Sequence, residues 1–182
     1  MKKIATIFLM MIGLCNLYSQ ELVPNEYNTN PIYWNNLKLE TTNYTKSYLT
    51  EQLQLDNAKI EYRVKHDEEW YDGDIVTLRY YPEGNVDNEW VGDFDLNISF
   101  KKDHYSLYGK VYVPGFEIKM MGHVFKIGET TREQVDGWLN NGKIVSENDK
   151  VYIYTFYTHL GYTTVSFLKA TNRLFGFDCD CQ

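Results

Sequence analysis

The stretch that decides the fold is IGETTREQVDGWL, residues 127–139. Thr130 and Glu133 have the spacing of a capping box, in which two side chains accept hydrogen bonds from backbone N–H groups at the start of a helix. Val135, Trp138 and Leu139 then fall on one face of that helix. The stretch therefore predicts a helix that begins at Thr130 and packs on the rest of the protein through its apolar face.

Downstream of this helix, hydrophobic residues recur at every second position, as in strands that have one buried face. Turn-forming residues, among them Asn148, Asp149 and Gly161, separate the runs. The predicted strands are Lys143–Ser146, Lys150–His159, Tyr162–Lys169 and Arg173–Asp178. The C-terminal part therefore reads as a helix followed by an antiparallel meander.

Upstream, residues 42–55 show a broad apolar stripe that indicates a second helix, with a strand over residues 52–55 as the alternative. Alternation with a period of two follows from Lys59 onward. The predicted strands there are residues 59–64, Ile75–Tyr81, Phe94–Phe100, Tyr105–Val113 and Phe116–Met121. The order of elements predicts an α+β, two-layer fold with helices on one face of an antiparallel β-meander sheet. It also suggests two tandem helix-plus-meander units, 42–122 and 123–182.

The N-terminus has the pattern of a signal peptide over residues 1–19: basic Lys2 and Lys3, an apolar segment, and the small Ser19 at the cut. Leu14 stands before Cys15 where lipoprotein signals have a small residue, which argues against a lipoprotein. The apolar segment is shorter than the roughly 20 residues of a membrane-spanning helix. We expect an exported, periplasmic or secreted protein without a transmembrane segment, in which residues 20–41 form an irregular arm.

The composition is that of a folded domain, with 43% hydrophobic and 16% aromatic residues in 182. Removal of residues 1–19 takes away two lysines and no acidic residue, so the formal net charge of −7 becomes −9. An acidic protein repels the phosphate backbone. The charge therefore argues against a nucleic-acid partner.

Two cysteines remain after such cleavage, Cys179 and Cys181, and they are candidates for a strained local disulfide. An intermolecular bridge and a metal site are the alternatives. The four histidines are scattered along the chain without metal-ligand spacing. No nucleophile motif is present either, so we expect no catalytic residues, no metal and no cofactor.

The segment Phe125–Val135, followed by a Leu-ending helix and a meander that contains Thr164-Val165-Ser166-Phe167, resembles the SmpA/OmlA and β-lactamase-inhibitor-protein-like (BLIP-like) domains. The resemblance covers the C-terminal part of the chain and departs from those domains at Leu139-Asn140, where they have Gly. It implies a two-layer α+β fold whose open sheet face docks other proteins and carries no catalytic residues.

Aromatic residues are the best candidates for a binding surface, since Trp and Tyr dominate interface energies. Because aliphatic Val151 and Ile153 match the helix better, Tyr152 and Tyr154 are predicted to line the open face. The further candidate partner-binding residues are Trp70, Tyr71 and Trp90.

The main hypothesis is a non-catalytic protein-binding module of inhibitor, immunity or envelope-assembly type. One alternative is a glycan-binding or glycan-active protein that uses aromatic platforms with Asp93 and Asp95. The other is a small-ligand or lipid pocket between the layers.

Overall fold

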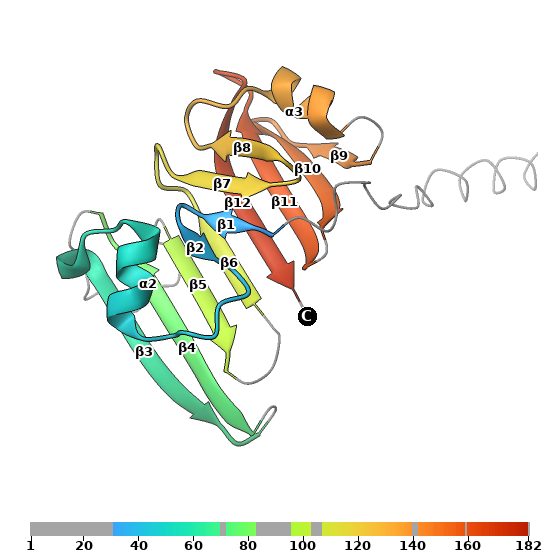
Figure 1. Cartoon of the computed structure of the whole chain (residues 1–182). Helices are drawn as coiled ribbons and strands as arrows, with labels where there is room; N and C mark the ends of the chain where they lie inside the picture. The colour runs from blue at the N-terminus through green and yellow to red at the C-terminus, as the bar shows by residue number, and fades with distance from the viewer. Residues whose placement is uncertain are drawn as a thin grey trace, which may run out of the picture.

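The computed structural model describes residues 31–69, 72–82, 96–102, 107–139, 142–158 and 160–181. These residues form two antiparallel sheets and two α-helices (Figure 1). The large sheet has the order β3-β4-β5-β6-β12-β11-β10-β9 and the small sheet the order β2-β1-β7-β8. The large sheet consists of β3 (Ile60–Asp67), β4 (Gly73–Tyr80), β5 (Leu96–Lys101), β6 (Leu107–Val111), β9 (Ile144–Glu147), β10 (Val151–Thr158), β11 (Gly161–Leu168) and β12 (Arg173–Cys181). The small sheet consists of β1 (Tyr33–Trp34), β2 (Leu37–Lys38), β7 (Glu117–Met120) and β8 (His123–Lys126).

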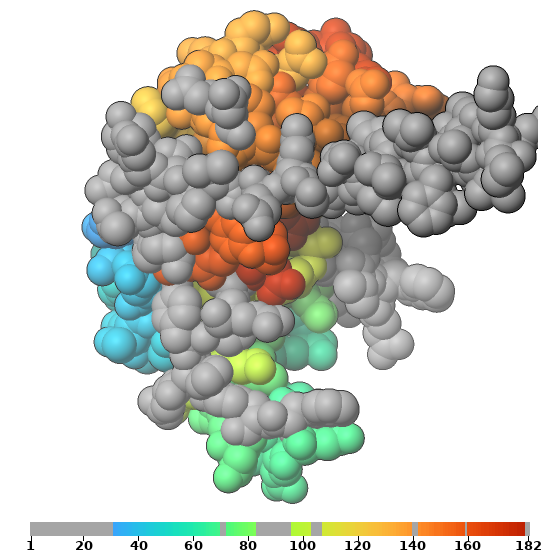
Figure 2. Space-filling view, turned by 90° about the vertical axis from the view of Figure 1, so that its right-hand side faces the viewer, coloured from blue at the N-terminus to red at the C-terminus, as the bar shows by residue number. Residues whose placement is uncertain are grey.

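Both helices and the small sheet lie on the same face of the large sheet (Figure 1). Helix α2 (Lys46–Leu53), followed by a 3-10 turn at Asn57–Lys59, lies near β3 and β4, and α3 (Arg132–Leu139) lies near β10. The small sheet fills the space between them. Figure 2, seen from the side, shows β1, β2 and α2 in blue to cyan along one side of the large sheet. No described helix or strand covers the opposite face, which we call the open face.

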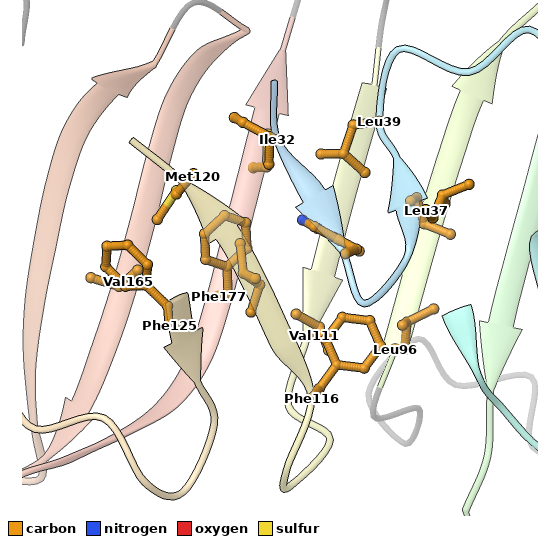
Figure 3. Close-up of a cluster of buried hydrophobic side chains, with 14 of the residues drawn as sticks. Ile32, Leu37, Leu39, Leu96, Val111, Phe116, Met120, Phe125, Val165 and Phe177 are labelled. Atoms are coloured by element: carbon orange, nitrogen blue, oxygen red, sulfur yellow. The ribbon is translucent and has the colours of Figure 1, made fainter. Parts of the chain in front are cut away.

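The centre of the core is Trp34 of β1, whose side chain is fully buried. Figure 3 shows its neighbours Phe116 and Phe177 among the buried side chains of the core. The Trp34 ring meets Phe116 and Phe177 edge to face, with centroids 6.2 Å and 5.6 Å away. A Cβ atom at Gly109 of β6 would lie 2.3 Å from Cη2 of Trp34. Only glycine therefore lets the indole lie against β6. The predicted irregular arm thus contributes two short strands and a central core residue.

The structure confirms an antiparallel sheet with helices on one face, but it is more dominated by strands than predicted. The small sheet, not a helix, covers the middle of the large one. Its strands present alternate apolar residues such as Ile118 and Phe125 to the core. The strand pair β6–β12 joins both predicted units in one continuous sheet. The predicted boundary after residue 122 falls in the turn between β7 and β8.

Helix α3 is capped one residue later than predicted. Thr131 and Gln134, rather than Thr130 and Glu133, form the capping box. The Gln134 N–H donates to Thr131 Oγ1 at 3.4 Å, and the Thr131 N–H donates to Gln134 Oε1 at 2.8 Å. Thr130 is buried, and its Oγ1 accepts a hydrogen bond of 2.8 Å from the Lys126 N–H. Its hydroxyl is thus engaged in the turn that connects β8 to the helix.

The apolar face of α3 is as predicted: Val135 and Leu139 are buried. Trp138 packs at the edge of this face, where its ring meets Phe125 of β8 with centroids 5.0 Å apart. The described helices do not have the length and apolar character needed to cross a bilayer.

Candidate functional site

Tyr152 and Tyr154 of β10 lie on the covered face, so the prediction that they line the open face is wrong. Tyr154 is only 2% exposed and faces α3. Because successive residues of a strand point to opposite faces, Val151 and Ile153 face the open side instead. A tyrosine there both fills the space beneath the helix and reaches a polar partner on it, which an aliphatic side chain cannot do.

That partner is Asp136 of α3. The Tyr154 hydroxyl donates to Asp136 Oδ2 at 3.0 Å, and Lys143 Nζ lies 2.8 Å from Asp136 Oδ1. Burial and the adjacent carboxylate raise the pKa of Tyr154 far above its ordinary value of 10.0. Partial burial opposes ionisation of Asp136, but the hydrogen bonds from Lys143 and Tyr154 outweigh it and lower its pKa below 3.8. This network holds α3 to the sheet.

Tyr152 is held in a similar way by cationic side chains. The Arg132 guanidinium lies 4.1 Å from the centroid of its ring, and the Lys169 ammonium lies 4.8 Å from it. Lys169 is in turn paired with Glu147 of β9 at 2.8 Å. Cations over an aromatic face stabilise its position. Both predicted tyrosines therefore contribute to the packing of the covered face.

The remaining predicted residues lie outside the described part of the chain. They are the candidate partner-binding residues Trp70, Tyr71 and Trp90, and the carboxylates Asp93 and Asp95 of the glycan alternative.

A different set of tyrosines lines the open face. Strand pairing sets Tyr157 of β10 beside Tyr162 of β11. The same row continues with Asp180 of β12 and Tyr108 of β6. We call these four residues the tyrosine row. The rings of Tyr157 and Tyr162 are in contact, with centroids 4.2 Å apart, and Tyr162 is 50% exposed. Since strands lie about 4.8 Å apart, the row spans about 14 Å of the sheet.

Two further rings lie on the same face. Tyr112, directly after β6, meets Phe175 of β12 with centroids 5.8 Å apart. A Cβ at Gly176 would lie 2.4 Å from Cε1 of Tyr112. Glycine at this position therefore makes room for the Tyr112 ring over β12. Burial raises the pKa of the Tyr112 hydroxyl, and the carboxylate of Asp178 adds to the effect.

The open face of β9, β10 and β11 carries no Asp, Glu, Lys, Arg or His side chain. It is formed by Ile144, Ser146, Val151, Ile153, Thr155, Tyr157, Tyr162, Thr164, Ser166 and Leu168. Ile144 and Leu168 are each 37% exposed. The solvated face of an antiparallel sheet is normally polar. Depletion of charges together with exposed tyrosines is the composition found at the centre of protein interfaces.

An ion pair borders this uncharged area. Lys110 of β6 and Asp178 of β12 are cross-strand neighbours whose Nζ and Oδ2 atoms lie 3.6 Å apart. Burial raises the pKa of Asp178 above 3.8, although Lys110 acts in the opposite direction. A hydrogen bond with Tyr108 and the charge of Asp178 raise the pKa of Lys110. The pair is thus partly desolvated in the free protein.

The opposite end of the open face, on β3 to β5, is charged. Glu61 pairs with Arg63 and, at 3.8 Å, with Arg79. Farther along these strands, Ile75 of β4 lies between Lys65 of β3 and Lys101 of β5. The face is therefore divided, with charges over β3 to β5 and none over β9 to β11. Sequence alternation places Tyr157 on the same side of β10 as Val151 and Ile153, so it would assign Tyr157 to the open face once the covered face is known.

A separate hollow of about 340 Å³ lies between the start of α2 and the covered face of β3 and β4. Its lining residues are Thr42, Asn43, Tyr44, Thr45, Tyr62, Val64, Val76 and Lys102. The Tyr62 hydroxyl donates to the Tyr44 carbonyl at 2.8 Å, which ties β3 to the segment before α2. The lining combines the aliphatic side chains of Val64 and Val76 with polar and aromatic residues.

Among the described residues, no group of three or more His, Cys, Asp and Glu side chains is placed to hold a metal ion. Cys179 is buried on the covered face. The side chain of Cys181 lies outside the described set, so the disulfide between Cys179 and Cys181 stays a prediction.

A comparison with protein-family models gave no match, and comparisons with curated proteins and with solved structures gave no significant similarity.

Proposed function

We propose that the protein is an exported, non-catalytic module that binds another protein through the open face of the large sheet. The single observation that carries this proposal is the tyrosine row, which lies on a face that no described element covers. The role would be that of an inhibitor, an immunity factor or an envelope-assembly factor, in line with the sequence resemblance and the predicted signal peptide.

The chemistry of the row supports a protein partner. A tyrosine offers a large apolar ring with a hydroxyl at its tip and has few rotatable bonds to immobilise on binding. The uncharged area beside it can be desolvated without the cost of burying an unpaired charge. Interface residues that contribute most to binding typically cluster in such an area and are surrounded by polar contacts.

A site-specific photo-crosslinker tests the proposal. The probe replaces Tyr162, which is 50% exposed on the open face, and in a matched protein it replaces Val124 of β8, which is 46% exposed on the opposite side of the molecule. Irradiation with an envelope fraction should give a discrete protein adduct from position 162 and not from position 124. The same adducts from both positions, or none from position 162, would contradict the proposal.

Binding measurements with the captured protein then test the row itself. A Tyr157→Ala, Tyr162→Ala double variant should weaken the complex by at least about 1–2 kcal/mol. Tyr33→Ala is the control, because Tyr33 lies on the small sheet. A complex of unchanged affinity with the folded double variant would show that the partner binds elsewhere.

The hollow beside α2 favours a second candidate function, the binding of a small apolar ligand. Its volume is within the usual range for small-molecule sites. Mass spectrometry of the purified protein under native conditions would reveal a co-purified molecule, and Val76→Trp should displace it, because the larger side chain would occupy part of the hollow. A ligand that survives this substitution would lie at another site.

A further inference from the structure

The two edges of the large sheet differ in how well they are protected against pairing with another strand. At one edge, β3 is long and carries charged side chains at alternate positions, Glu61, Arg63, Lys65 and Asp67. Charges on an edge strand disfavour edge-to-edge association. At the other edge, β9 has four residues, all exposed, and pairs only with β10 among the described strands (Figure 1). Its aliphatic Val145 is 52% exposed.

The backbone of β9 presents two residues to an incoming strand. The Asn148 N–H donates to the Val151 carbonyl at 3.1 Å, so residues 148 and 151 form a hydrogen-bonded pair at the hairpin end. Such pairs alternate along an antiparallel ladder. Ser146 is therefore bonded to Ile153, whereas Val145 and Glu147 direct their N–H and C=O groups away from β10.

We propose that β9 pairs with β9 of a second copy of this chain, antiparallel and centred on Val145, so that two large sheets join edge to edge. The register is self-complementary about a two-fold axis, as closed dimers require. Val145 faces its own copy, Ile144 faces Ser146, and Lys143 faces Glu147. No like charges are opposed in this register. The outward N–H and C=O groups of Val145 form the central hydrogen-bonded pair.

This dimer uses the edge of the sheet and leaves the tyrosine row accessible. It is therefore independent of the proposed function. Each chain has a negative formal net charge, −7 for the full sequence and more negative without residues 1–19, and this charge opposes association. Added salt screens that repulsion, so the dimer should become stronger as the salt concentration rises.

Sedimentation velocity of the purified protein tests the proposal. The weight-average sedimentation coefficient should rise with concentration toward that of a dimer. Val145→Pro should abolish this rise, because proline removes an outward N–H and leaves the β9–β10 hydrogen bonds intact. The matched control is Val64→Pro on β3. Val64 is also 52% exposed, and its N–H also points outward, because the hydrogen bond from the Tyr81 N–H to the Lys59 carbonyl sets the ladder. Val64→Pro should dimerise like the wild type.

A second variant keeps the test valid if Val145→Pro does not fold. In the proposed register, Val145→Cys brings two thiols together across the two-fold axis at a Cα separation that a disulfide can span. Oxidation should give a covalent dimer several-fold faster than it does for Val64→Cys. A wild-type protein that stays monomeric up to about 1 mM, a Val145→Pro variant that dimerises normally, or equal cross-linking at positions 145 and 64 would each overturn the proposal.

Discussion

The Tyr154 hydroxyl donates a hydrogen bond of 3.0 Å to the Asp136 carboxylate, and this contact joins β10 to α3. The contact lies on the covered face of the large sheet, where Tyr154 is buried. With Tyr154 beneath the helix, the alternation of the strand places Tyr157 on the open face. The packing of α3 and the composition of the candidate binding surface therefore depend on the same strand register.

Loss of this hydrogen bond should destabilise the protein. Tyr154→Phe keeps the ring but leaves Asp136 with Lys143 as its described hydrogen-bonding partner. Hydrogen bonds to charged groups contribute about 1.5–3 kcal/mol, so the free energy of unfolding should fall by about that amount in urea melts. Tyr157→Phe is the control, because its hydroxyl is on the open face. Equal effects at both positions would contradict the structural role of the contact.

Asp136 and Asp178 should change stability in opposite directions as the pH falls. The pKa of Asp136 is lowered in the folded state. The stabilising contribution of Asp136 is therefore complete above about pH 5. It is lost as the pH falls through the unfolded-state pKa of about 3.9 toward the lower folded-state pKa. Burial raises the pKa of Asp178. The folded state thus binds a proton on the Asp178 carboxylate more tightly than the unfolded state does. Protonation of Asp178 therefore stabilises the fold as the pH falls toward the unfolded-state pKa.

Urea melts of the Asp136→Asn and Asp178→Asn variants between pH 7 and pH 3 measure both effects. The stability advantage of the wild type over Asp136→Asn should shrink with falling pH, because the carboxylate that distinguishes them becomes protonated. The free energy of unfolding of the wild type should rise relative to that of Asp178→Asn over the same pH range. A shift of the same sign for both variants would show that one of the two environments is wrongly described.

Much of the fold could be predicted from the sequence, because α3 and the strands after it have long, regular patterns of apolar residues. The small sheet could not, since its strands have two to four residues, too few for a period to appear. The covered face of β10 could not be determined either. Both of its faces are apolar, and the choice depends on a partner, Asp136, that lies on another element.

The tyrosine row could not be predicted for the same reason. If Val151 and Ile153 are assigned to the covered face, alternation places Tyr157 there too, and it is interpreted as a core residue. Tyr108 and Tyr162 join Tyr157 only through the order of the strands, in which β6 lies beside β12 and β12 beside β11. That order brings together residues far apart in the chain, and local patterning contains no information about it.

The capping box of α3 predicts how substitutions at Thr131 and Gln134 change the stability of the protein. Thr131→Ala removes the acceptor of the Gln134 N–H, so it should cost about 0.5–2 kcal/mol, the usual effect of an N-cap. Gln134→Ala removes the reciprocal bond, and the double variant should cost less than the sum of the two single variants, because residues in contact are not additive. Thr131→Ser retains the hydroxyl and should be nearly neutral. An unchanged midpoint in denaturant for Thr131→Ala would rule out this cap.

Two glycines that look alike in the sequence should respond to alanine in opposite ways. At Gly109, the added methyl would lie 2.3 Å from Cη2 of Trp34. That indole is fully buried and meets Phe116 and Phe177 edge to face, so any shift of the indole would disturb these contacts. Overpacking of this kind typically costs about 1–3 kcal/mol. At Gly137 in α3, the added Cβ would meet nothing within 4 Å apart from the adjacent residues and the backbone of the helix itself. Alanine should stabilise the helix there by about 0.5–1 kcal/mol.

A double-mutant cycle with Trp34→Phe identifies the cause of the Gly109 effect. The smaller ring leaves room for a methyl group on β6, so Gly109→Ala should be less costly in the Trp34→Phe background than in the wild type, which gives a coupling free energy of at least about 0.5 kcal/mol. Gly137→Ala should show no such coupling, because the residue is remote from the indole. If the cost of Gly109→Ala is the same in both backgrounds, the methyl group clashes with something other than Trp34, and the close approach of β1 to β6 is not what requires glycine at this position.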